Sequence, residues 1–132
     1  MEYLNKTSAK VYDHTTEAQV VVLEWGTDFI TLEEGKEAVN AVLQSVLTHQ
    51  KTKLLALINA EGFEVSFLDW LVASWYAPAY QAGLTKIAHL MAGNPAGNLS
   101  AEIVSWEDTS GIVFKNIYES NEVEAVAWLK TS

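Results

Sequence analysis

The chain has no cysteine, few basic residues and no long apolar run, and each absence excludes a class of protein. Without cysteine there is no disulfide, no Cys-ligated zinc and no thiol nucleophile. Eight basic residues against seventeen acidic ones give a net charge of −9, which repels nucleic acid phosphates and anionic lipid head groups. No stretch approaches the roughly eighteen consecutive apolar residues of a membrane span. We therefore expect neither a nucleic acid partner nor a membrane span.

The first residues also lack a targeting signal. Residues 1–7 show no basic region followed by an apolar run, so we expect no signal peptide and a cytoplasmic location. The length of 132 residues suits one domain with a core of its own. Since no repeat, low-complexity tract or linker interrupts the chain, we expect a single domain over residues 1–132.

What the chain does contain is a regular alternation of apolar strands and amphipathic helices. Strands are expected over Ala9 to Asp13, Glu17 to Trp25, Lys53 to Asn59, Leu84 to Met91 and Ile112 to Tyr118. Helices are expected after the capping box Thr31-Leu-Glu-Glu34 and after the caps Ser66, Asn98, and Ser120 or Asn121. The order β-β-α-β-α-β-α-β-α predicts an α/β fold. We expect a mostly parallel sheet of about five strands that opens with an antiparallel hairpin.

The sheet is predicted to be apolar on both faces. The strands ending at Trp25 and Asn59 carry apolar residues at alternate and intervening positions alike. Right-handed crossovers that progress in one direction place their helices on one face only. We therefore expect a homodimer to cover the second face.

The end of the chain resembles a known family. Residues 116–129 read Asn-Ile-Tyr-Glu-Ser-Asn-Glu-Val-Glu-Ala-Val-Ala-Trp-Leu, with Glu124-Ala125 and Trp128-Leu129 as the most specific part. This segment is similar to the closing strand and helix of SpoIIAA-like proteins, a branch of the STAS and SEC14-like domains. The resemblance implies a (β-α)n fold and a non-enzymatic role, since many members are small bacterial proteins without an assigned activity.

Ser66 is the candidate helix cap or phosphorylation site. Among STAS relatives, the anti-sigma-factor antagonists are switched by a phosphoserine in an Asp-Ser-Ser/Thr-Gly-like loop before the helix that follows a central strand. The resemblance puts Ser66 in the analogous place. The chain departs from that pattern, because Asn59-Ala-Glu-Gly-Phe-Glu-Val65 replaces the loop and both the Asp-Ser pair and the following glycine are missing.

Motifs for catalysis are missing from the sequence. His14, His49 and His89 fall in a turn, at a helix end and in a strand, without metal-ligand spacing. No serine lies in a nucleophile elbow and no Gly-rich phosphate loop follows a strand. Glu61 and Glu64 form a potential carboxylate pair, although such residues around a loop glycine are more often solvated. We expect no catalytic residue, no metal and no cofactor.

The candidate pocket or interface lies where the loop containing Phe63 meets a strongly aromatic helix. Its residues are Phe63, Trp70, Trp75, Tyr76 and Tyr80. We expect Trp70 to face the core with Phe67, and Pro78 to kink or end the helix. Trp75 and Tyr76 then remain for a pocket wall, a subunit contact or a partner surface.

Three functions fit this sequence. The first is a non-enzymatic STAS-like interaction or regulatory module, with a protein partner or a second copy as its ligand. The alternative is a carrier of a small apolar or lipid-like ligand in a SEC14-like manner. A weak hydrolase or isomerase is the third, and no motif supports it.

Overall fold

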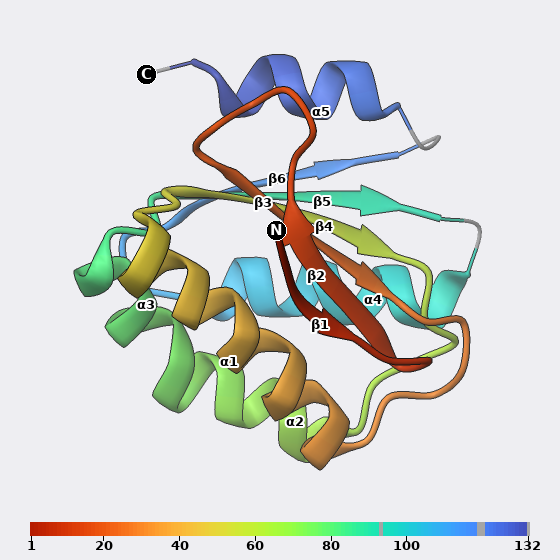
Figure 1. Cartoon of the computed structure of the whole chain (residues 1–132). Helices are drawn as coiled ribbons and strands as arrows, with labels where there is room; N and C mark the ends of the chain where they lie inside the picture. The colour runs from red at the N-terminus through yellow and green to blue at the C-terminus, as the bar shows by residue number, and fades with distance from the viewer. Residues whose placement is uncertain (93, 119–120, 132) are drawn as a thin grey trace.

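A six-stranded sheet runs through the structure with its strands in sequential order, β1-β2-β3-β4-β5-β6 (Figure 1). The computed structural model describes residues 1–92, 94–118 and 121–131. The strands are β1 (Glu2–Asn5), β2 (Ala9–Asp13), β3 (Val20–Trp25), β4 (Lys53–Ile58), β5 (Lys86–Met91) and β6 (Val113–Ile117). β1, β2 and β3 pair in antiparallel fashion, and β3 to β6 pair in parallel. The prediction of an α/β fold with a mostly parallel sheet and an antiparallel opening is confirmed.

The sequence prediction omitted β1. Its four residues are exposed or half-buried and pair only with β2, so no apolar alternation marks them. β6 forms the opposite edge of the sheet, and Lys115 and Asn116 interrupt its apolar pattern, as is common for an edge strand.

The helices lie on both faces of the sheet. They are α1 (Leu32–His49), α2 (Val65–Trp70), η1 (Leu71–Trp75, a π-helical turn), α3 (Tyr76–Ala82), α4 (Pro95–Glu107) and α5 (Glu122–Leu129). In Figure 1, α1 to α4 cover one face and α5 covers the other. The capping box predicted for α1 is present, with Thr31 accepting from the Glu34 backbone N–H and the Glu34 carboxylate accepting from the Thr31 N–H.

The coverage by α5 removes the reason for expecting a homodimer. Val22, Leu55 and Leu90 on the second face pack against Ala125 and Leu129 of α5 in one buried cluster. No strand follows α5 in the described chain, so no crossover rule fixes its side. The prediction that this face is left uncovered is therefore wrong, and homodimerisation itself stays a prediction.

Two basic side chains at the start of their strands hold the end of α5. The Lys86 Nζ donates to the backbone carbonyls of Trp128 and Thr131, at 3.3 and 2.6 Å. It also lies 4.8 Å from the centroid of the Trp128 ring, within cation–π distance. The Lys53 Nζ donates to the Thr131 carbonyl at 3.4 Å. Because cations favour the carbonyl end of a helix, these lysines help fix α5 on this face.

Two of the predicted caps are wrong. α2 begins one residue before Ser66, with Glu64 as its N-cap, and α4 begins at Pro95 with Asn94 as its N-cap. Pro95 fits the first helical position because its missing N–H would have no partner there. Asn98 lies inside α4, where its Nδ2 donates to the Ala92 carbonyl. Asn121 does cap α5, accepting from the Glu124 N–H at 3.0 Å, while Ser120 lies outside the described residues.

Candidate functional site

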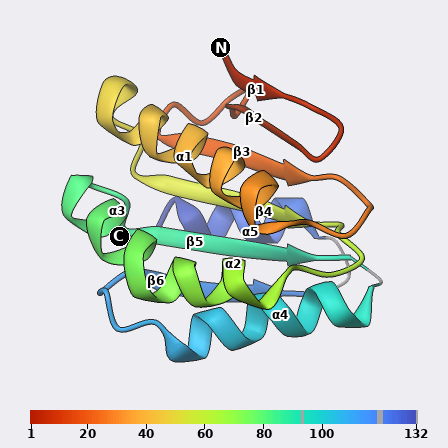
Figure 2. The ribbon, with the colours of Figure 1, turned by 90° about the horizontal axis from the view of Figure 1, so that it is seen from below.

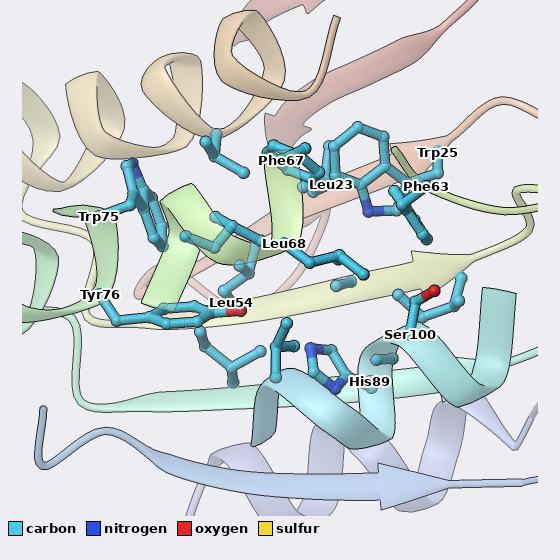
Figure 3. Close-up of a pocket in the computed structure, with 17 residues that line it drawn as sticks. Leu23, Trp25, Leu54, Phe63, Phe67, Leu68, Trp75, Tyr76, His89 and Ser100 are labelled. Atoms are coloured by element: carbon cyan, nitrogen blue, oxygen red, sulfur yellow. The ribbon is translucent and has the colours of Figure 1, made fainter. Parts of the chain in front are cut away.

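An apolar pocket lies between the sheet and the helices α2, η1 and α4 (Figure 3). Its floor comes from β3, β4 and β5, including Leu23, Leu54 and Ile87. Its roof comes from the aromatic helix of the sequence prediction, which is made up of α2, η1 and α3. The helix α4 closes one side with Ala101 and Val104. The pocket leaves about 50 Å³ for the centres of water-sized molecules. One end of it lies near the place where the loop containing Phe63 meets the aromatic helix, for which the sequence predicted a pocket or an interface.

The mouth of the pocket lies between α2 and α4. Only Leu68 of α2 and Ser100 of α4 are half-buried among the described lining residues, and every other one is buried. Seen from below in Figure 2, α2 lies between α1 and α4. α4 packs mainly against β4, β6 and η1 rather than against α2. A molecule entering from solvent would therefore pass Leu68 and Ser100.

The loops after β3 and β4 position Phe63 at one end of the pocket. Ile30 and Phe63 form a parallel bridge, and the Ile30 N–H donates to the Gly62 carbonyl at 2.9 Å. The Phe63 ring meets Trp25 edge to face, with centroids 5.1 Å apart. Phe67 lies 5.8 Å from the same indole. These aromatic contacts hold Phe63 in place at one end of the pocket.

Glu64 ties the same loop to the start of α1. Its Oε1 accepts from the Leu32 N–H at 3.0 Å and its Oε2 accepts from the Ser66 hydroxyl at 2.6 Å. The Ser66 bond, followed by the Leu32 bond, lowers the pKa of the Glu64 carboxyl below its usual value. Ser66 is exposed in the first turn of α2 and does not line the pocket. The carboxylate that faces it would repel a phosphate at this position.

The structure reverses the predicted roles of the aromatic residues in the helix. Trp75 and Tyr76 are buried, each with 3% of its surface exposed, and both line the pocket. Trp70 is only half-buried, with its ring against Phe67 and the Lys36 Nζ 5.3 Å from its centroid. The prediction that Trp70 is the core residue of this helix is therefore wrong, whereas Trp75 and Tyr76 do form a pocket wall, one of the three places that the sequence left open for them.

A π-helical turn causes this reversal. The Tyr76 N–H bonds to the Leu71 carbonyl, five residues back, so η1 contains one residue more per turn than an α-helix. The additional residue rotates Trp75 and Tyr76 toward the sheet. The helix does not end at Pro78 but continues to Ala82, because the wide turn relieves the clash that proline makes with the carbonyl four residues earlier.

Tyr80, the last of the predicted site residues, lies outside the pocket. It is 42% exposed, and its ring packs over Gly111, where an added Cβ would lie 2.9 Å from the Tyr80 Cζ. Gly111 has a φ of 107°, a conformation that favours glycine. Of the predicted set, the structure thus brings Phe63, Trp75 and Tyr76 together at the pocket and leaves Ser66, Trp70 and Tyr80 outside it.

His89 is the polar residue of the pocket that sequence reasoning did not select. It lies on β5 with only 5% of its surface exposed, and its Nδ1 is 2.9 Å from the Asn116 Oδ1 on β6. Burial lowers the pKa of His89 from 6.5 to about 4, although the bond to Asn116 opposes the shift. The imidazole is therefore neutral near pH 7. One feature of the sequence could have indicated that His89 is buried: it alternates with Ile87 and Met91 on one face of the strand.

Tyr76 and Ser100 supply the hydroxyl groups of the pocket, and the buried indole N–H of Trp75 is a further polar group in its lining. In Figure 3 the Tyr76 hydroxyl is directed into the pocket. Burial, with a smaller contribution from the charge of Asp108, raises the pKa of Tyr76 far above its usual value, so the hydroxyl keeps its proton. The Ser100 hydroxyl donates to the Ala96 carbonyl at 3.0 Å.

The other histidines and acidic residues do not converge on this pocket. The His14 Nδ1 accepts backbone N–H groups in its own turn, and the His49 ring contacts Tyr3. Over the described residues, no group of three or more His, Cys, Asp or Glu side chains could hold a metal ion. Within the same residues, no helix is long and apolar enough to cross a bilayer.

Comparison with known proteins adds no relative, because no protein-family model and no curated protein matches the chain. The resemblance of residues 116–129 to SpoIIAA-like proteins therefore stays a prediction.

Proposed function

We propose that this chain is a non-enzymatic, STAS-like module that binds a small, mainly apolar ligand in the pocket beneath α2 and η1. The observation that supports this function best is the composition of the pocket. Its walls are apolar and aromatic, and the polar groups are few: those of His89, Tyr76 and Ser100 and the indole N–H groups of Trp25 and Trp75. A concave apolar site with a few polar groups is the usual form of a small-molecule site.

The size of the pocket limits the ligand. The accessible 50 Å³ holds a few water molecules, since one water needs roughly 10–15 Å³ on this kind of measure. It is well below the roughly 300–1,000 Å³ of pockets for drug-sized ligands. An acyl chain does not fit it in this conformation, which argues against the lipid carrier that a SEC14-like role would require. A ring-sized ligand enters only if Leu68 rotates away from the mouth.

This mode of entry suggests how the module could regulate a partner. A ligand that passes between α2 and α4 would change the spacing of these helices, and their outer surfaces are available for contact. Ligand occupancy would then alter a surface that a partner recognises. The STAS-like regulatory role and the binding of an apolar ligand are compatible on this proposal.

A second candidate function is protein interaction through the outer face of α4. Leu99 and Trp106 are exposed on this face and Ile103 between them is half-buried, while Ala101 and Val104 pack inward. Trp106 is 69% exposed and Leu99 is 51% exposed. Exposed aromatic and aliphatic side chains in one stripe favour a partner surface.

Native mass spectrometry of the protein purified from its own host distinguishes the two candidates. The test uses the pocket-filling variant Ala101→Val and, as its control on the exposed side of the same helix, Ala96→Val. Ligand binding predicts a small mass adduct on the wild type and on Ala96→Val that Ala101→Val lacks. A protein partner lost only on Trp106→Ser, without any small adduct on the wild type, would support the α4 surface instead.

A further inference from the structure

A hydrogen-bond chain leads from the pocket to α4 through β6. The His89 Nδ1 is 2.9 Å from the Asn116 Oδ1, and the Asn116 Nδ2 donates to the Ser105 Oγ at 3.2 Å. The Ser105 hydroxyl in turn donates to the Glu102 carbonyl at 2.7 Å. Whether each side-chain group in this chain donates or accepts is determined by the next group along it. The last group is a backbone carbonyl, which can only accept.

The direction of this chain determines which nitrogen of His89 carries the proton. A serine hydroxyl has one hydrogen, and Ser105 uses it on the Glu102 carbonyl, so its Oγ can only accept from Asn116. The amide nitrogen of Asn116 therefore faces Ser105 and the amide oxygen faces His89. An amide oxygen only accepts, so the proton of the neutral imidazole lies on Nδ1. The Nε2 of His89 is left as a hydrogen-bond acceptor.

The remaining polar groups of the pocket complement this acceptor. The bond to Asn116 uses the Nδ1 of His89, so it leaves the Nε2 as the ring nitrogen that can accept from a ligand. A second donor in the lining is the Trp75 Nε1–H, which is buried without a hydrogen-bond partner in the described part of the chain. Figure 3 shows one ring nitrogen of His89 on the β6 side and the other on the side of the Tyr76 hydroxyl. Phe114 contacts both rings, with centroid distances of 5.3 Å to Tyr76 and 5.6 Å to His89. A donor hydroxyl and an acceptor nitrogen thus border the same end of the pocket.

The pocket also lacks a charge that could balance an ionised ligand. None of the described lining residues is Asp, Glu, Lys or Arg. A buried carboxylate or ammonium group needs an opposite charge or several hydrogen bonds, and neither is at hand. A ligand for this pocket is therefore uncharged.

We propose that the ligand of this pocket is an uncharged alcohol or phenol whose hydroxyl group donates a hydrogen bond to the Nε2 of His89. This inference rests on the proposed function and specifies its ligand class. A hydroxyl can donate to His89 and accept from Tyr76 at the same time, whereas a ketone can only accept. The carbon skeleton of the ligand occupies the apolar part of the pocket between Leu54, Phe67 and Val104.

Cyclohexanol and cyclohexanone test this preference, because the two six-membered rings are similar in size and only the alcohol carries a hydrogen-bond donor. Both are titrated by NMR into the wild type, His89→Leu and the control His49→Leu, whose histidine lies outside the pocket. We expect the alcohol to bind the wild type and His49→Leu about threefold to tenfold more tightly than the ketone. The preference should disappear in His89→Leu.

The titration distinguishes a failure of the proposed pocket function from a failure of the proposed hydroxyl preference. If both rings bind the wild type equally and Ala101→Val abolishes both, the pocket function stands and the hydroxyl preference is wrong. If neither ring binds the wild type saturably, both proposals are wrong. A second measurement, the ¹⁵N shifts of the His89 ring in the wild type near pH 7, does not depend on any variant folding. It should show the proton on Nδ1, and a proton on Nε2 would overturn the inference.

Discussion

Replacing Gly35 by alanine should destabilise the protein, although the same change stabilises most helices. In a helix interior alanine is more favourable than glycine by about 0.5–1 kcal/mol. At Gly35, however, an added Cβ would lie 2.5 to 2.6 Å from ring atoms of Phe67. Phe67 is 1% exposed and packs against Trp25, Phe63 and Trp70, so its ring cannot move aside freely. Overpacking costs about 1–3 kcal/mol, so after the gain in helix propensity the net loss is up to about 2.5 kcal/mol.

Urea unfolding followed by circular dichroism measures this change. The midpoint should fall for Gly35→Ala while the dependence on urea stays the same. The control is the background Phe67→Leu, in which the ring is gone and Gly35→Ala should be neutral or stabilising. The coupling between the two changes isolates the clash. An increase in stability for Gly35→Ala in the wild-type background would refute the packing argument.

Three further predictions concern Trp75, Gly97 and the protonation of His89. Trp75→Ala should lower the free energy of unfolding by about 3–5 kcal/mol, because the indole is buried, whereas Trp70→Ala should lower it much less, because Trp70 is only half-buried. Equal losses of stability in the two variants, measured by urea unfolding, would argue against the role of the π-helical turn. Gly97→Ala should lower the free energy of unfolding by roughly 1–3 kcal/mol. The added Cβ would lie 2.3 Å from the Ala60 carbonyl oxygen and would force the first turn of α4 away from the loop after β4. An unchanged melting temperature would contradict this close approach. Stability should also fall as the pH is lowered from 6.5 to about 4, because the unfolded chain binds a proton at His89 in this range and the folded protein does not. That loss amounts to about 3 kcal/mol, and urea titrations at several pH values should find it reduced in His89→Gln but not in His49→Gln.

The fold could be predicted because its signals are local. The capping box at Thr31 and the apolar strand before Asn59 each fix an element without reference to the rest of the chain. Their alternation then predicts the parallel sheet. β1 was missed because a short edge strand buries little and carries no clear pattern.

The site was only partly predictable because it depends on helix phase and on contacts across the sheet. Sequence spacing places Trp70 inward under regular α-helical geometry, and a single π-helical turn reverses that assignment. By helix propensity alone Gly35 is a weak position in α1, but it makes room for the Phe67 ring. The hydrogen bond that orients the His89 ring comes from Asn116 on a neighbouring strand, 27 residues away in the sequence. No local sequence pattern indicates such a contact.

The most direct test of the ligand pocket is to locate a bound probe in it. Benzene is titrated into ¹³C,¹⁵N-labelled protein, and isotope-filtered NOE spectra identify the protons that it contacts. Our account predicts saturable NOEs to Leu68, Val104 and the ring of Tyr76, all of which disappear in Ala101→Val and persist in Ala96→Val. NOEs confined to Leu99 and Trp106 on the outer face of α4, unchanged by Ala101→Val, would contradict it.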